Sequence, residues 1–353
     1  MTAAREVLLI VSVDTEEDNW SRARVGVSVE NIRELRRLSS CLDRLGLRTT
    51  YFTTYQVAIQ QWAVDILQEI RAGGGAELGA HLHPWNTPPL AEALLPRNSM
   101  LKNLPAQLQL AKLRQLTTAL SDAFGVAPRA FRAGRFGLGS TTVSALRACR
   151  YQVDSSVTPY VSWETTDGGP TFVGAPLDAY GLGERGDVTI PEPGGPLVEI
   201  PLTCGYTRFS SAHWRTLHRL LQARPARLLH AAGFASRLGL ARLAILSPET
   251  ECVRDMLALS GGALEGGVRH LQLFLHSPSL CPGLSPWIST TADVNRLYAS
   301  IEGYMAGLSR MASVRSVTMS EACMALGFGE RVAAPAGLPA KEEAGVDMTS
   351  TGH

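Results

Sequence analysis

Close to the N-terminus, an almost continuous apolar and β-branched run, VLLIVSV at 7–13, leads directly into a cluster of acidic residues at 14–18. A run that is apolar on both faces predicts a buried strand of a parallel sheet. In parallel α/β folds the carboxyl ends of the strands carry the active site. We therefore expect a parallel α/β fold with the acidic cluster at its functional edge.

Strand-like and helix-like segments alternate along most of the remaining sequence. Strands are expected at 48–54, 76–83, 129–133, 151–157, 270–276 and 314–319, and helices at 30–45, 62–70, 106–124, 141–150, 212–246 and 292–308. Such alternation is typical of a parallel sheet or an α/β barrel. The 353 residues are compatible with a single barrel, for which about 250 residues are common. We expect one domain over residues 1–330.

Two segments depart from this alternation. Residues 165–201 are rich in Gly, Pro and Asp and contain short β-like pieces at 187–190 and 197–200, which predicts a β-hairpin or loop insertion near the barrel mouth. Residues 331–353 are rich in Ala, Gly, Pro and Glu and have no periodicity. We expect this tail to be disordered.

Charge and cysteine usage limit the possible partners and location. The 33 basic and 32 acidic residues nearly cancel, so no long-range field toward nucleic acid or an anionic membrane is expected. The most hydrophobic stretch, 228–246, is interrupted by charged residues and glycines and does not predict a membrane span. Six scattered cysteines without a CxxC pair predict buried free thiols in a reducing compartment. Together with the lack of a secretory signal pattern, this predicts a cytoplasmic protein of unknown oligomeric state.

Two histidines and two carboxylates are the candidates for a metal site. His81 and His83 are two apart in a predicted strand, so both imidazoles face one side. Such a pair can hold Zn²⁺ or a similar divalent ion if a third ligand is supplied. Asp14 and Glu16 have the same spacing and can both point into one pocket. The alternative for the acidic cluster is the first turn of a helix, which favours negative charge.

Three further segments contain polar residues near predicted strand ends. Arg132 ends a strand in FRAGRFG and can hold a carboxylate ionised, while Arg135 either serves an anionic substrate group or is simply exposed. His276 follows an apolar strand and is suited to proton transfer near neutral pH. Asp154 either supports the site or caps a turn.

The order of these elements resembles the polysaccharide deacetylases, the NodB-homology or carbohydrate esterase 4 family, over roughly residues 7–321. The segments that carry the resemblance are ELGAHLHPWNTPP (77–89), FRAGRFG (131–137) and HSPSLCPGLSPW (276–287), and they look closest to the divergent WalW-like branch. The resemblance implies a TIM-like, distorted (β/α)7 barrel with a divalent metal, usually zinc. It also implies a hydrolase that removes an N-acetyl group from an amino sugar in a glycan, glycolipid or small glycoconjugate.

Residue roles follow from the resemblance. His81 and His83 match the metal histidines, Asp14 the general base, Arg132 the arginine that orients the base, and His276 the general acid. The family's Asp-Asp pair is replaced here by Asp14-Thr15-Glu16, which makes Glu16 the candidate carboxylate ligand. The roles of Asp14 and Glu16 are open to exchange. The histidine spacing also departs from the family's i, i+4.

Substrate contacts are expected from one set of residues, in which the aromatic members are alternatively part of the core: Trp85, Arg135, Phe136, Asp154 and Trp287. Two other functions are compatible with these residues. One is a deformylase or another hydrolase of non-peptide C–N bonds in a small molecule. The other is a catalytically inactive barrel that binds glycans.

Overall fold

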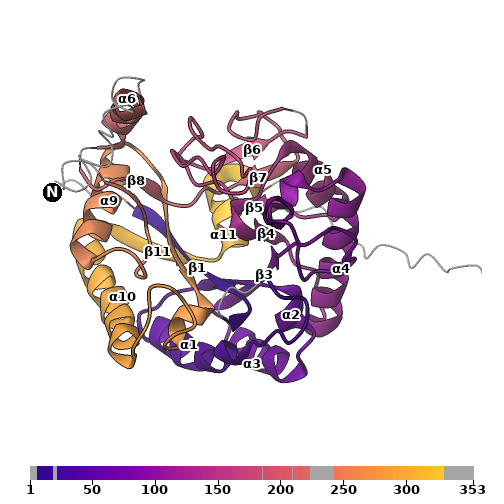
Figure 1. Cartoon of the computed structure of the whole chain (residues 1–353). Helices are drawn as coiled ribbons and strands as arrows, with labels where there is room; N and C mark the ends of the chain where they lie inside the picture. Colours follow the sequence, from indigo (N-terminus) through magenta and orange to yellow (C-terminus); the bar gives the residue numbers. More distant parts are fainter. Residues whose placement is uncertain (1–5, 19–21, 185, 209, 223–241, 330–353) are drawn as a thin grey trace, which may run out of the picture.

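A mixed sheet of nine strands forms the centre of the molecule and curls into an open half-barrel (Figure 1). The structure is a computed structural model that describes residues 6–18, 22–184, 186–208, 210–222 and 242–329. The strand order is β10-β1-β2-β3-β4-β5-β7-β6, and β11 also pairs with β1. These strands are β1 (Glu6–Thr15), β2 (Thr49–Thr53), β3 (Ala76–Leu82), β4 (Ala130–Ala133), β5 (Val153–Asp154), β6 (Tyr180–Leu182), β7 (Leu197–Glu199), β10 (His270–His276) and β11 (Ser313–Val317).

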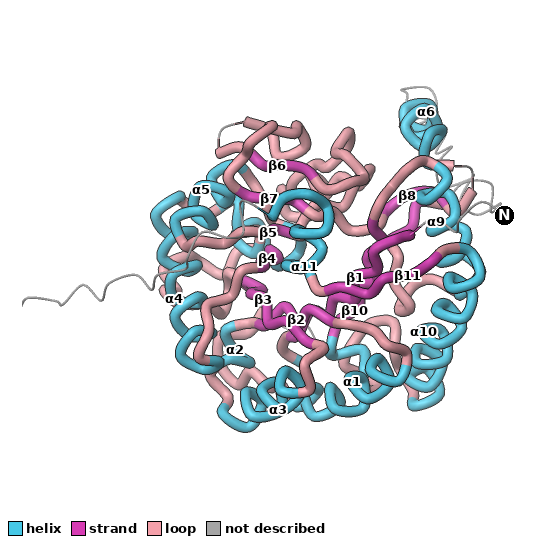
Figure 2. The backbone as a smooth tube through the Cα atoms, turned by 180° about the vertical axis from the view of Figure 1, so that it is seen from behind, coloured by secondary structure: helices cyan, strands magenta, loops and turns pink. Residues whose placement is uncertain are grey.

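The longer helices surround the sheet on its outside, and the short helix α11 (Met319–Cys323) lies within its curl, as Figure 2 shows from behind. The longer ones are α1 (Leu35–Arg44), α3 (Gln61–Ala72), α4 (Ala106–Phe124), α5 (Ser140–Ala148), α6 (Ser211–Gln222), α9 (Val253–Glu265) and α10 (Thr291–Met311). Short helices and turns are α2 (Tyr55–Ala58), α11 (Met319–Cys323), η2 (Glu30–Glu34), η3 (Pro96–Ser99), η4 (Leu101–Asn103), η5 (Gly134–Phe136), η6 (Ser277–Leu280) and η7 (Met324–Phe328). None of the helices within the described ranges combines the length and apolar character needed to traverse a bilayer.

Strand β1 is hydrogen-bonded on both edges. Parallel β10 pairs with residues 8–14 on one edge. The other edge is divided, because β11 pairs with residues 6–10 and β2 with residues 11–15. The acidic residues at the carboxyl end of β1 therefore lie on a backbone that neighbouring strands hold on both sides.

Alternation along β1 explains which side chains reach the interior of the half-barrel. Val7, Leu9, Val11 and Val13 belong to the large core cluster that includes the outer helices. Leu8 and Ile10 point the other way and pack with residues of α11 in a second cluster. Burying an aliphatic side chain of this size stabilises the fold by about 1.5–3 kcal/mol. This second cluster forms an apolar plug inside the half-barrel. Because side chains alternate along a strand, Ser12, Asp14 and Glu16 continue the inner face beyond the plug.

The structure confirms the predicted α/β distorted-barrel fold, with refinements in the insertion. Strands β6 and β7 form the antiparallel pair expected within 165–201. Strand β7 also pairs in parallel with β5, so the insertion is part of the main sheet. The predicted strand at 187–190 is wrong, because these residues form turns.

The predicted helix at 212–246 is wrong in its last part. Helix α6 is described to Gln222, whereas β9 (Leu243–Ile245) is a strand that pairs antiparallel with β8 (Cys204–Tyr206). Helix α9 was not predicted, because Gly261 and Gly262 in its interior are poor helix formers. The predicted disordered tail, 331–353, lies outside the described residues.

All six cysteines are free thiols, as predicted. They are not uniformly buried, because Cys252 is exposed and Cys149 and Cys281 are partly so.

Candidate metal and catalytic site

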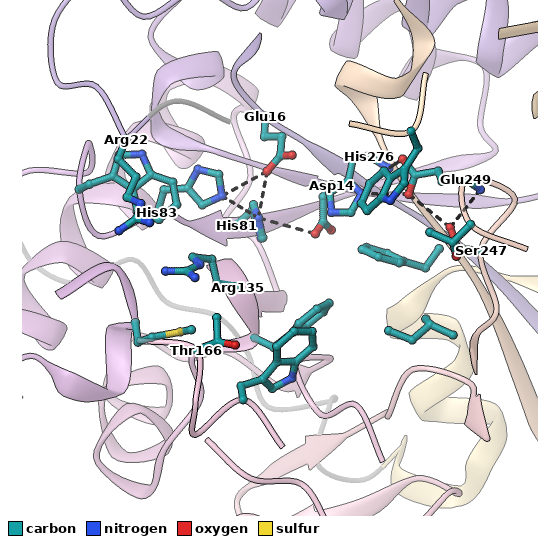
Figure 3. Close-up of a pocket in the computed structure, with 18 residues that line it drawn as sticks. Asp14, Glu16, Arg22, His81, His83, Arg135, Thr166, Ser247, Glu249 and His276 are labelled. Carbon is teal, nitrogen blue, oxygen red and sulfur yellow. Dashed lines mark hydrogen bonds and ion pairs between the residues drawn. The ribbon is translucent and has the colours of Figure 1, made fainter. Parts of the chain in front are cut away.

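A pocket of about 420 Å³ opens where β1, β3 and β10 end (Figure 3). The parallel pairing of these strands around β1 and β2 brings segments far apart in the sequence to one edge. The lining includes nine of the eleven residues singled out from the sequence: Asp14, Glu16, His81, His83, Trp85, Arg135, Phe136, His276 and Trp287. A tenth, Arg132, lies directly behind Asp14.

The two histidines turn their Nε2 atoms toward each other. His81 Nδ1 is 3.1 Å from the carbonyl oxygen of Arg132, and His83 Nδ1 is 2.8 Å from a carboxylate oxygen of Glu17. Both partners only accept hydrogen bonds, so each Nδ1 carries the proton. The two Nε2 atoms are then left facing each other at 3.1 Å. A cation held between the two Nε2 atoms, either a proton or a metal ion, would stabilise this close approach.

Glu16 completes a set of three donors. Its Oε2 lies 3.2 Å from His83 Nε2 and 3.6 Å from His81 Nε2. Ligands held about 2.0–2.1 Å from a tetrahedral ion lie roughly 3.3 Å apart, so the three separations fit a zinc-type site. Within the described residues, Glu16, His81 and His83 form the one such group of three ligating side chains, and all three are buried.

The pKa values of Glu16 and His83 are shifted in the directions that favour a negative carboxylate beside a positive charge. Burial opposes ionisation of Glu16, but hydrogen bonds from His81 and His83 and the nearby charge of His276 outweigh it and hold its pKa well below the usual range. Burial also acts against the His83 cation, yet Glu17 and Glu16 raise the pKa of His83 to about 10. The carboxylates thus stabilise positive charge at this point, whether it is a proton or a metal ion.

Asp14 belongs to a different pair. Arg132 Nη1 donates to Asp14 Oδ1 at 2.6 Å, and both side chains are buried. The other oxygen, Oδ2, lies 3.6 Å from His81 Nε2 and faces the pocket. Asp14 is therefore a carboxylate beside the candidate metal site whose charge is already neutralised by a fixed guanidinium.

Every nitrogen of Arg132 has a partner, which fixes its orientation. Nε donates to the Ser155 carbonyl, and Nη2 donates to the hydroxyls of Ser12 and Ser155. Gln272 joins the same hydroxyls from β10. This polar layer separates the apolar plug from the pocket.

Glu249, which no sequence pattern singled out, holds His276 on the side of the pocket away from His83. Its carboxylate accepts from His276 Nδ1 at 3.0 Å and from the His276 backbone N–H at 3.1 Å. Burial lowers the pKa of His276, but the charge and hydrogen bond of Glu249, with Glu16 and Asp14, raise it to about 9. His276 is therefore a positioned cation at neutral pH, suited to donating a proton.

Glu17 was also missed as a site residue, because it was assigned to a possible helix start. Besides His83, its carboxylate accepts a hydrogen bond from Asn86 Nδ2 at 2.7 Å. Carboxylates in this position orient a ligating histidine and increase its basicity. Asp18 instead accepts from Ser28 and from backbone N–H groups at the start of η2.

Aromatic side chains form most of the remaining wall. Trp85 stacks on His83 with ring centroids 4.2 Å apart, and Trp287 lies 5.5 Å from the His276 ring. Phe136 stacks on Trp163 and contacts Phe274, and neither of these two residues was predicted from the sequence. The pocket therefore offers flat apolar surfaces between its polar groups.

Asp154, the eleventh residue, is fully buried and does not line the pocket. Its neighbours in the sequence, Val153 and Ser155, point to the inner face, which turns Asp154 to the opposite face of the sheet. There it bonds to Ser156 and is paired in register with Glu199 on β7. Burial raises the pKa of both carboxyls, that of Glu199 most strongly.

Gly134 explains part of the FRAGRFG motif. A β-carbon at this position would lie 2.5 Å from His83 Cδ2 and 2.6 Å from the Leu82 carbonyl oxygen, both closer than contact distance. The absence of a side chain lets η5 approach His83.

We expect Gly134→Ala to displace His83 and weaken divalent-metal binding by at least about tenfold, as misorientation of a ligand does. Metal titration monitored by calorimetry measures this. Gly75→Ala is the matched control, because its β-carbon would meet only an ordinary 3.6 Å contact with Asp43. Equal metal affinity in Gly134→Ala and wild-type protein would contradict the role of Gly134.

No family model matches the sequence, and no curated protein matches it. Solved structures do match. A protein from Parabacteroides distasonis, provisionally described as a glycoside hydrolase/deacetylase, aligns with a TM-score of 0.55 and 12% identity over 94% of this chain and 71% of its own. A protein from Mycobacterium smegmatis, provisionally described as a polysaccharide deacetylase, aligns with a TM-score of 0.49 and 15% identity over 94% and 93% of the two chains.

The chitin deacetylase of Colletotrichum lindemuthianum aligns with a TM-score of 0.41 and 12% identity over 91% of this chain and 89% of its own. The chain therefore shares the fold of the Parabacteroides distasonis protein. At 12% identity this similarity, with its TM-score of 0.55, shows the fold alone.

Proposed function

We propose that the protein is a cytoplasmic, metal-dependent hydrolase that removes an N-acetyl group from an amino sugar in a glycan, glycolipid or small glycoconjugate. One observation carries the proposal: a group of three ligating side chains, a carboxylate paired with arginine and a histidine paired with glutamate converge in one pocket. The WalW-like branch of the deacetylase family is part of the proposal and is supported by the segments 77–89, 131–137 and 276–287.

Glu16, His81 and His83 would hold the metal. Two imidazoles and one carboxylate suit a catalytic Zn²⁺, which also requires an open position toward substrate. When bound, such an ion polarises a carbonyl and lowers the pKa of water toward about 7.

The protein's own groups then divide the proton transfers. Asp14 accepts the proton of the attacking water, oriented by the hydrogen bond from Arg132. His276 donates a proton to the leaving nitrogen, and Glu249 keeps its Nδ1 engaged so that Nε2 carries the transferred proton. Each such group typically contributes a factor of about 10²–10⁴ to the rate.

A second candidate is hydrolysis of another non-peptide C–N bond, such as a formamide, in a small molecule. The aromatic side chains of Phe136, Trp163 and Phe274 around the pocket favour it, because they suit a compact substrate with an apolar face. An inactive glycan-binding barrel is less consistent with the site, since each pair and ligand needed for hydrolysis is in place.

Product analysis tests the proposed function. Wild-type protein supplied with Zn²⁺ should release acetate and a free amine from N-acetylated amino sugars, and EDTA should abolish the release. Matching N-formyl sugars distinguish the second candidate, for which formate would be the faster product. Folded protein that releases neither acid and is indifferent to EDTA would overturn the hydrolase proposal.

A further inference from the structure

Two arginines converge at the rim of the pocket, on the side where His83 lies (Figure 3). Arg135 Nη1 donates to Asp167 Oδ2 at 2.6 Å and also to Ser99 Oγ. Arg22 Nη2 lies 3.7 Å from the same Asp167 oxygen. Asp167 thus aligns both guanidinium groups beside the candidate metal site.

The two guanidinium groups have donors to spare. Within the described residues, Ser99 and Asp167 both contact Nη1 of Arg135, and its Nε and Nη2 have no hydrogen-bond partner. Arg22 makes one ion pair among the described residues, and its partner is Asp167. Buried Arg132 provides the contrast, because all three of its nitrogens are engaged. Arginine presents five N–H donors in a planar fork that matches carboxylate and phosphate.

The rim of the pocket at Arg22 and Arg135 also carries an excess of positive charge. Asp167 is the one carboxylate within ion-pair distance of Arg22 or Arg135 among the described residues. Two guanidinium charges against one carboxylate leave one positive charge uncompensated. Because the Arg135 side chain is only 26% exposed, solvent screens that charge incompletely.

The backbone that presents Arg135 is held in an unfavourable conformation. Arg135 and Phe136 have φ values of 55° and 57°, in the left-handed region that side chains other than glycine rarely adopt. Such outliers persist where the surrounding structure imposes them, often at ligand sites. Here the conformation directs both residues into the pocket lining.

We infer that the substrate carries an anionic oxygen group, a carboxylate or a phosphate, adjacent to its scissile amide, and that Arg135 and Arg22 bind this group. The inference deepens the proposed function and rests on it for the position of the amide. Phe136 and Trp163, stacked beside Arg135, receive the apolar face of the same substrate. The substrate class is therefore an acidic N-acylated amino sugar rather than a neutral one.

Three ligands test the inference by calorimetry on full-length His276→Ala protein, in which turnover is slowed. N-Acetylmuramic acid carries a carboxylate on a lactyl ether at one ring carbon next to the acetamido carbon. N-Acetylglucosamine 1-phosphate carries a phosphate at the other neighbouring ring carbon, and N-acetylglucosamine has neither group. We expect at least one anionic ligand to bind tenfold or more tightly than the neutral sugar, since charge-assisted hydrogen bonds are the strong ones.

Arg135→Gln and Arg22→Gln, each in the His276→Ala background, should remove most of that preference, measured as the ratio of each variant's affinity for the anionic ligand to its affinity for N-acetylglucosamine. Arg22 serves as the second variant because its side chain is 44% exposed and makes one long ion pair, so folding does not depend on it. Arg36→Gln is the matched control, an exposed arginine on α1 paired with Glu69 outside the pocket.

Each outcome decides the inference. Preference for the carboxylate, the phosphate or both supports it and identifies the group, provided that the arginine variants abolish the preference. Equal affinity for all three ligands overturns it, and so does a preference that survives both variants, because the metal would then be the anion receptor. Anion binding without any amide hydrolysis would refute the proposed function but not the arginine subsite.

Discussion

Purified protein should bind about one divalent metal ion per chain, and His81→Ala combined with His83→Ala should abolish that binding and all hydrolysis. The two Nε2 atoms and Glu16 Oε2 are the donors that converge in the pocket. Replacing a residue that merely orients a ligand typically costs 10–100-fold in metal affinity. Removing two of three ligands should exceed that, so metal content should fall below detection by elemental analysis.

The control for this experiment is a histidine elsewhere on the surface. His213 on α6 is exposed and contacts Ser210, and His213→Ala should retain full metal content. Circular dichroism checks that the double variant is folded, because both replaced side chains are buried. Full metal content in a folded double variant would refute the site.

The same assay separates the roles of Asp14 and Glu16, which the sequence leaves open. We expect Glu16→Gln to lose metal and Asp14→Asn to keep metal while losing activity. The reason is geometric, since Arg132 occupies one oxygen of Asp14, whereas Glu16 Oε2 faces both histidines. The opposite pattern would exchange the two roles.

Local patterns in the sequence predicted the parts of the site that depend on strand alternation. Asp14 with Glu16, and His81 with His83, are each two apart at the end of a strand, which puts both members on one face. The run at 7–13 was long and apolar enough to identify the central strand of the sheet.

Local alternation could not predict residues whose environment depends on strand pairing or on contacts distant in the sequence. Asp154 lies in a predicted strand, 151–157, of which only two residues pair, and the register with β7 decides which face it takes. Glu17 contacts His83 across 66 positions of sequence, a separation that no periodicity encodes.

Glu249 was missed for a related reason. It follows β9, a strand that was assigned to a helix because residues 228–246 are strongly hydrophobic. Recognising that strand would have placed a carboxylate after a strand end, which is where the other candidates were found. A short apolar run alone does not distinguish a strand from a buried helix.

His276→Ala should keep the metal and lower kcat by about 10²–10⁴, the range for a proton-transfer group. The side chain does not belong to the group of three ligands, so metal content should match that of wild-type protein. Loss of metal together with activity would instead show that His276 supports the metal site. Unchanged kcat would exclude His276 as the acid.

The pH profile identifies the acid more directly. His276 donates a proton only in its protonated form, so kcat should be sustained below its pKa of about 9 and decline above it. Glu249→Gln removes the charge that raises this pKa, so the alkaline limb should move to lower pH, toward the ordinary histidine value of about 6.5. His213→Ala should leave the limb in place. An alkaline limb unmoved by Glu249→Gln would mean that a different group delivers the proton, because the carboxylate that bonds to His276 Nδ1 sets the titration of that imidazole.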